Sequence, residues 1–171
     1  MEIRPALASE APALAELAGR LFRTTYAEQI PLRDMEAYIA TAFTAQAQAA
    51  EIGEPGATVL VAADGSCLMA YAQLRTSPPP LARADPEAME IARFYLDPRL
   101  HGTGIASTLM EACLDWARGR GQRNVWLQVW EVNRRALAFY VKEGFTDMGQ
   151  TTFQVGNILY RDRVLTRTLE S

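Results

Sequence analysis

The sequence has 171 residues, 49% of them hydrophobic, with a formal net charge of -3 and a mean hydropathy near zero. These values exclude a disordered chain and a membrane-spanning protein. They are typical of a single globular domain, which we expect to cover residues 1–171. The small negative charge argues against a nucleic-acid partner, because nucleic-acid binders carry clustered basic side chains. A cationic small substrate fits the sign of the charge better.

The first residues, MEIRPALASEAPALAELAGRLF, lack the pattern of a signal peptide or a membrane helix, because Glu10, Glu16 and Arg20 interrupt the apolar runs. We therefore expect a cytoplasmic protein with no membrane partner. Cys67 and Cys113 lie far apart in the sequence and the chain has one histidine, so we expect no metal site. Both thiols are expected to be buried and inert.

The first half of the chain is predicted to contain a short strand, two helices and then three more strands. Apolar residues at helical spacing indicate helices over 9–22 and 34–43, and the alanine-rich stretch after them ends in a turn at Gly53. Short apolar runs indicate strands over 2–7, 58–63, 67–75 and 89–96.

The second half is predicted to alternate helices and strands. Its elements are a helix over 105–118, a strand over 124–130, a helix from Asn133 to Gly144, and strands over 145–155 and 157–169. The whole order, β-α-α-β-β-β-α-β-α-β-β, predicts an α/β fold: a mixed sheet of about seven strands with about four helices on its faces.

Two strands carry side chains of functional interest. Alternation along strand 89–96 places four residues on one face, namely Glu90, Ala92, Phe94 and Leu96. In strand 124–130 the residues that share a face are Trp126, Gln128 and Trp130. Those tryptophans either fill the core or border a substrate channel, and Gln128 requires a polar partner.

The loop RLHGTG, residues 99–104, joins strand 89–96 to helix 105–118. Free backbone N–H groups at a helix N-terminus predict a phosphate site, with a plain tight turn as the alternative. The spacing excludes a Walker loop, which requires Gly-Lys followed by Ser or Thr. The dinucleotide fingerprint fails at its third glycine, which is Ser107 here.

Arg99, Gly102 and Gly104 fit the pattern Gln/Arg-x-x-Gly-x-Gly/Ala, within the phrase EIARFYLDPRLHGTGIASTLM. A second block, LQVWEVNRRALAFYVKEGF, follows at a fitting distance. Together the two blocks resemble the GNAT superfamily of acetyl-CoA-dependent N-acetyltransferases, most strongly over residues 88–147. The final segment, 144–169, is similar to the branch that includes polyamine acetyltransferases.

The resemblance implies a central twisted mixed sheet whose splayed middle strands hold acetyl-CoA. It implies cofactor contacts from the strand backbones at Phe94 and Leu96, and from Asn133 and Tyr140. The loop residues implied to line the pyrophosphate are Arg99, His101, Gly102, Thr103, Gly104, Ile105 and Ala106.

The resemblance also implies catalytic roles. Tyr140 corresponds to the usual proton donor for the leaving thiolate, and Glu90 to an acidic residue that often acts as the base. Each has a structural alternative: Tyr140 as a packing aromatic, and Glu90 as a strand-end carboxylate paired with a residue such as Arg93.

The implied activity is direct transfer of an acetyl group to a primary amine through a ternary complex. The acceptor would be a small-molecule amine, a polyamine or a peptide N-terminus. A non-catalytic acetyl-CoA-binding regulatory module is the alternative. Acidic and aromatic residues around the predicted helix junction could bind a cationic acceptor, namely Tyr26, Glu28, Asp34 and Glu36. A homodimer is possible if the last strand pairs with a second chain.

Overall fold

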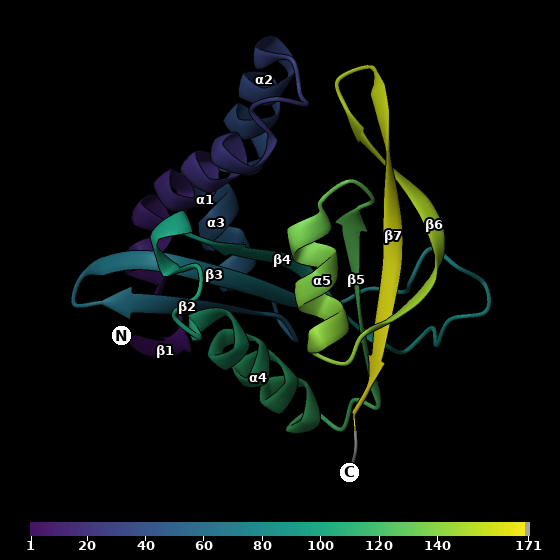
Figure 1. Cartoon of the computed structure of the whole chain (residues 1–171). Helices are drawn as coiled ribbons and strands as arrows, with labels where there is room; N and C mark the ends of the chain where they lie inside the picture. Colours follow the sequence, from purple (N-terminus) through teal and green to yellow (C-terminus); the bar gives the residue numbers. More distant parts are fainter. Residues whose placement is uncertain (170–171) are drawn as a thin grey trace.

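A computed structural model describes residues 1–169. They contain a seven-stranded sheet with strand order β1-β2-β3-β4-β5-β7-β6 (Figure 1). The strands are β1 (Glu2–Pro5), β2 (Thr58–Asp64), β3 (Cys67–Thr76), β4 (Met89–Leu96), β5 (Asn124–Trp130), β6 (Thr146–Val155) and β7 (Ile158–Thr168). The pairing of β4 with β5 is parallel and the other pairings are antiparallel, so the predicted mixed sheet is confirmed.

The described residues form five α-helices and two 3-10 turns. They are η1 (Ala8–Glu10), α1 (Ala11–Tyr26), α2 (Leu32–Ala42), α3 (Ala45–Ile52), η2 (Pro98–Leu100), α4 (Ile105–Arg118) and α5 (Arg134–Lys142). The expectation of about four helices missed α3, which forms from the alanine-rich stretch. This helix begins at Thr44, whose hydroxyl accepts a hydrogen bond from the Ala47 amide at 3.0 Å. It buries only Gln48, so its sequence carries a weak amphipathic signal.

The helices cover both faces of the sheet (Figure 1). One apolar cluster joins α1 and α2 to the face that carries Val59, Val61 and Tyr71. A second cluster joins α4 and α5 to the opposite face, around Leu109 and Leu127. The chain therefore buries two cores, and the central strands lie between them.

Strand β4 contains a bulge at Ala92. The register with β3 passes from Leu74 opposite Ile91 to Gln73 opposite Arg93, so Ala92 has no partner. An extra residue reverses the alternation of the side chains that follow it. The predicted common face of strand 89–96 is therefore wrong: Phe94 and Leu96 pack on the α4 side with Ile91, and Glu90 points to the other face.

The last strand is enclosed within the sheet over most of its length. Strand β7 lies between β5 and β6, and β1 and β6 form the edges of the sheet. The predicted pairing of the last strand with a second chain is wrong for Asp162 to Thr168, where both sides of β7 are hydrogen-bonded, and stays a prediction for Ile158 to Tyr160, which pair with β6 alone.

The two cysteines differ in exposure. Cys113 on α4 is fully buried, as predicted, whereas Cys67 at the start of β3 is exposed. The prediction for Cys67 is wrong because this residue follows the β2–β3 turn, where the strand leaves the core. None of the helices in residues 1–169 is long and apolar enough to cross a membrane.

Candidate active site

A cleft of about 1170 Å³ opens where β4 and β5 separate. These strands pair only at Met89 with Val125 and at Glu90 with Trp126. Beyond that point they diverge, so the edge of β4 that faces β5 has no strand partner. The predicted splay of the middle strands is confirmed. The cleft is lined by residues of the two strands, the loop after β4, α5 and the C-terminal part of α1.

The loop after β4 turns through two left-handed glycines. Gly102 has φ 79° and Gly104 has φ 86°, conformations that side chains disfavour. Gly104 directly precedes α4, whose first amides, at Ile105, Ala106 and Ser107, have no acceptor within the helix. These N–H groups and the positive end of the helix dipole lie beside the cleft, an arrangement that can accept an anion.

His101 and Thr103 take different positions in this loop. The Thr103 hydroxyl donates to the Leu100 carbonyl at 2.7 Å, which stabilises the turn. His101 lines the cleft and its Nδ1 lies 2.6 Å from Nη1 of Arg135 on α5. Partial burial and the positive charge of Arg135 lower the pKa of the imidazole, so the neutral ring accepts a hydrogen bond from the guanidinium at pH 7.

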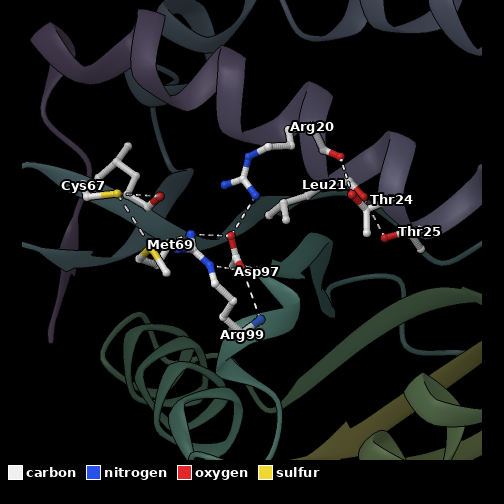
Figure 2. A network of polar contacts seen from close by, with 9 residues as sticks. Arg20, Leu21, Thr24, Thr25, Cys67, Met69, Asp97 and Arg99 are labelled. Carbon is white, nitrogen blue, oxygen red and sulfur yellow. Dashed lines mark hydrogen bonds and ion pairs between the residues drawn. The ribbon is translucent and has the colours of Figure 1, made fainter.

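Arg99 points away from the cleft. Its Nε and Nη2 donate to the carboxylate of Asp97 at 2.9 and 3.0 Å, and its backbone N–H donates to the same carboxylate at 3.0 Å (Figure 2). Arg20 of α1 donates to Asp97 at 2.7 Å from the other side. The side chain of Arg99 therefore holds the loop, and it does not line the cleft as the structure stands.

Tyr140 lines the cleft from α5 and is 7% exposed. Its ring packs against Phe94 and Phe139, with centroids 6.2 and 5.4 Å away. Burial raises the pKa of the phenol well above its usual value of about 10, and no residue in 1–169 hydrogen-bonds to the hydroxyl. The phenol is therefore protonated at pH 7 and free to donate into the cleft.

Asn133 has the predicted capping role. Its side-chain oxygen accepts a hydrogen bond from the Ala136 amide at 3.1 Å and so begins α5. Asn133 also lines the cleft, together with Phe94 and Leu96 of β4. The structure thus brings together four of the residues predicted for cofactor contact: Phe94, Leu96, Asn133 and Tyr140.

Glu90 lies outside the cleft. It belongs to the paired part of β4, is 8% exposed, and accepts a hydrogen bond from Nε of Arg75 at 2.6 Å. Arg93, the partner considered from the sequence, instead pairs with Glu51 of α3 at 2.6 Å. This geometry favours the structural alternative for Glu90, and its role as a base stays a prediction.

The predicted acceptor residues separate in the structure. Tyr26 lines the cleft, whereas Glu28, Asp34 and Glu36 do not. Glu36 is paired with Arg23 on the surface, at 2.6 Å. Trp126 is buried and fills the core, whereas Trp130 is half-buried and borders the cleft. Each of the two alternatives considered for the tryptophans therefore applies to one of them.

Sequence reasoning missed Asp162 on β7. Its carboxylate is the polar partner that Gln128 required, with Nε2 donating to Oδ2 at 2.9 Å. Asp162 is 6% exposed, although its neighbours Arg161 and Arg163 suggest a solvated segment. The available signal was alternation: Tyr160, Asp162 and Val164 share the apolar face of this strand.

Comparison with known proteins agrees with this geometry. The sequence model of the acetyltransferase (GNAT) family matches residues 18–145. An uncharacterised N-acetyltransferase of Mycobacterium tuberculosis is 30% identical over 161 residues, which cover 94% of this chain and 99% of that protein.

Solved structures share the fold. The PaiA N-acetyltransferase of Thermoplasma acidophilum, in complex with coenzyme A, superposes with a TM-score of 0.80 at 22% identity, over 98% of each chain. YncA of Salmonella typhimurium, a putative acetyltransferase with its cofactor acetyl-CoA, has a TM-score of 0.69 at 18% identity and covers 100% of this chain and 95% of its own.

A mixed sheet that splays beside a glycine loop, together with these matches, defines the class of protein. The chain belongs to the GNAT family and is an N-acetyltransferase. No cluster of three or more His, Cys, Asp or Glu side chains within residues 1–169 has the geometry of a metal site.

Proposed function

We propose that this protein transfers the acetyl group of acetyl-CoA directly to a primary amine while both substrates occupy the cleft. The observation that carries the proposal is the meeting of three features in that cleft: the unpaired edge of β4, the free amides that begin α4, and the hydroxyl of Tyr140.

The first two features fit the two ends of an acylated coenzyme A. Pyrophosphate oxygens accept hydrogen bonds from the amides of Gly104, Ile105 and Ala106, where the helix dipole favours negative charge. An extended pantetheine arm carries amide groups that can pair with the β4 backbone near Phe94 and Leu96, as an added strand would. His101 and Arg135 flank this path and add polar contacts.

The chemistry requires a neutral amine as nucleophile and a protonated sulfur as leaving group. An alkyl ammonium with a pKa near 10.4 is neutral in only about one molecule in a thousand at pH 7, so the reaction rate rises with pH until the amine is deprotonated. Tyr140, kept protonated by burial, donates its proton to the departing thiolate of coenzyme A. The proton lost by the amine then passes to solvent or to a base, and a proton from solvent restores the phenol of Tyr140.

The experiment is a thiol-release assay with purified full-length protein, acetyl-CoA and a panel of alkyl, aryl and peptide amines. Mass spectrometry of the products would show an acetyl group, a mass increase of 42 Da, on the amine. We expect at least one amine to be acetylated in proportion to the thiol released. Tight acetyl-CoA binding with no acetylated product across the panel would contradict the proposal and favour a regulatory module.

A further inference from the structure

A small pocket lies beside the cleft and is walled by aromatic side chains. Its volume is about 30 Å³, and its lining is Phe22, Tyr26, Ile30, Trp130, Phe153, Tyr160 and Asp162. Tyr26 and Trp130 also line the cleft, so the two spaces share a wall. The pocket therefore adjoins the cleft at these two side chains.

The aromatic walls of the pocket are fixed in place. The Tyr26 and Trp130 ring centroids are 5.9 Å apart, and Trp130 and Tyr160 meet edge to face at 5.9 Å. The Tyr26 hydroxyl is 3.2 Å from that of Tyr95, and the Tyr160 hydroxyl donates to the Gln29 carbonyl at 3.2 Å. Because these hydroxyls are bonded elsewhere, the pocket is enclosed largely by aromatic rings.

Asp162 is the one charged group in the lining of this pocket. Its carboxylate is 6% exposed, and the Nε2 of Gln128 donates to its Oδ2 at 2.9 Å. Within residues 1–169 it forms no ion pair: Arg163 pairs with Asp147 at 2.8 Å, and Arg161 lies 3.9 Å from Glu131. The protein thus buries a carboxylate without a cation to balance it.

A buried and unbalanced carboxylate is costly unless a cation joins it. Burial, with a further contribution from the negative charge of Glu131, raises the pKa of Asp162, which is the direction that a missing positive partner produces. Aromatic faces attract cations and repel anions, so the walls and the carboxylate both favour a positively charged ligand. A volume of about 30 Å³ is enough to hold a group the size of an ammonium.

We propose that this pocket binds a second ammonium group of the acceptor, with Asp162 as its counter-ion and Tyr26, Trp130 and Tyr160 as its aromatic walls. The proposal rests on the proposed function, because the first amine of the same acceptor reacts in the cleft. The acceptor is then an alkyl diamine, or a longer polyamine in which two amino groups have the same spacing. One amino group is held charged in the pocket while the other is acetylated in the cleft.

The test measures binding first, so that it does not depend on turnover. Diamines from 1,3-diaminopropane to 1,8-diaminooctane, and the monoamine of equal chain length for each, are titrated calorimetrically into the full-length protein with and without coenzyme A. We expect at least one diamine to bind about ten times more tightly than its monoamine, because the diamine places one ammonium in the pocket and its other amine in the cleft, whereas the monoamine can fill only one of these two positions.

Two variants assign the preference to Asp162. Asp162→Asn keeps the shape and an oxygen for Gln128 but removes the charge, and should abolish the preference for the diamine. Asp147→Asn removes one negative charge from the neighbouring strand, outside the pocket, and should retain the preference. Melting temperatures of both variants confirm that they fold.

Equal binding of diamines and monoamines, no binding of either, or a preference that survives in Asp162→Asn would overturn the proposal. The thiol-release assay tests the proposed acetyl transfer independently of this binding result. A diamine preference without acetyl transfer supports the pocket and contradicts the transferase mechanism. Acetyl transfer with equal kcat/KM for diamine and monoamine supports the transferase mechanism and contradicts the pocket.

Discussion

Tyr140 is a phenol whose surroundings suit proton donation without any specific hydrogen-bond partner. Aromatic rings surround it, and their low polarity disfavours the phenolate. A high pKa keeps the proton on the oxygen through the physiological pH range. The same property makes the phenol a weak acid, so its proton moves to sulfur while the carbon–sulfur bond of the tetrahedral intermediate breaks, because transfer to a fully formed thiolate, with a conjugate-acid pKa of about 8.5, is uphill.

Replacing Tyr140 with phenylalanine isolates this role, because the substitution removes the hydroxyl and keeps the ring packing. We expect Tyr140→Phe to lower kcat by about 100-fold, the lower range for loss of a general acid. The affinity for acetyl-CoA should stay nearly unchanged in calorimetry.

Tyr71→Phe provides the control for Tyr140→Phe. Tyr71 is another buried phenol, 1% exposed, with no hydrogen-bond partner in residues 1–169, and it lies outside the cleft. Its loss should leave kcat unchanged. Full activity of Tyr140→Phe would remove the hydroxyl from the mechanism.

At this scale the sequence predicted which residues line the cleft better than it predicted their partners. Tyr140 and Asn133 stand at predicted positions because the spacing on one helix determines where both side chains point. The partner of Glu90, by contrast, is Arg75 of β3, which no local pattern encodes. Asp97 lies only two residues before Arg99, but its contact with Arg20 of α1 depends on the tertiary fold. Asp162 was missed because its burial depends on Gln128 from a strand 34 residues earlier.

At the scale of elements, Asp97 connects α1 to the loop after β4. Two arginines from different elements, Arg20 and Arg99, donate to this one carboxylate, which is 2% exposed (Figure 2). The position of the glycine loop therefore depends on α1, which also supplies Tyr26 to the cleft. The hydrogen bonds from Arg99, followed by those from Arg20, hold the pKa of Asp97 well below its usual value.

Asp97→Asn should lower the free energy of unfolding at pH 7 by about 2 kcal/mol, within the usual range for hydrogen bonds to a charged group. The folded-state pKa lies below the unfolded value of about 3.9, so this stabilisation is present above pH 4 and is lost as the pH falls further. The difference between wild type and variant in urea unfolding should therefore shrink below about pH 4.

The matched control for this substitution is Asp115→Asn, which removes an exposed pairing with Arg118 on α4. That change should cost less than about 1 kcal/mol at pH 7. A difference for Asp97→Asn that is constant between pH 2 and pH 7 would contradict the assignment.

The elements themselves were predicted from periodicity with two errors of physical origin. The helix α3 was not predicted because alanine and glutamine give little difference in polarity between its faces. The bulge at Ala92 was not predicted because it arises from the pairing of β4 with β3. Alternation along a single strand carries no information about that pairing. That one residue determines that Glu90 and Phe94 lie on opposite faces of the sheet.

At the scale of the whole molecule, the sheet consists of two parts, β1 to β4 and β5, β7 and β6, joined by the short parallel pairing at Met89 and Glu90. A ligand that bridges the gap adds contacts to both parts. Such a ligand stabilises the folded state by about 2.7 kcal/mol when present at 100 times its Kd.

We therefore expect acetyl-CoA at that concentration to raise the melting temperature by roughly 5 to 10 °C, and NAD or ATP to have a smaller effect. Gly104→Ala should reduce the shift, because the strained backbone disturbs the amides that begin α4. Gly65→Ala, which places alanine at another positive φ of 59° in the distant β2–β3 turn, should destabilise similarly but keep the full shift. Equal shifts for acetyl-CoA and NAD would contradict the assignment of the cleft.

The separation of β4 from β5 also determines how the backbone of β4 exchanges with solvent. Amides of a central strand are ordinarily the last in a protein to exchange their hydrogens, yet those beyond Ala92 that face the gap have no neighbouring strand to protect them. This protein therefore has a solvent-accessible sheet edge between its central strands, flanked by α5 and the C-terminal part of α1. Deuterium uptake over residues 92–96 would thus report directly whether a substrate fills the gap.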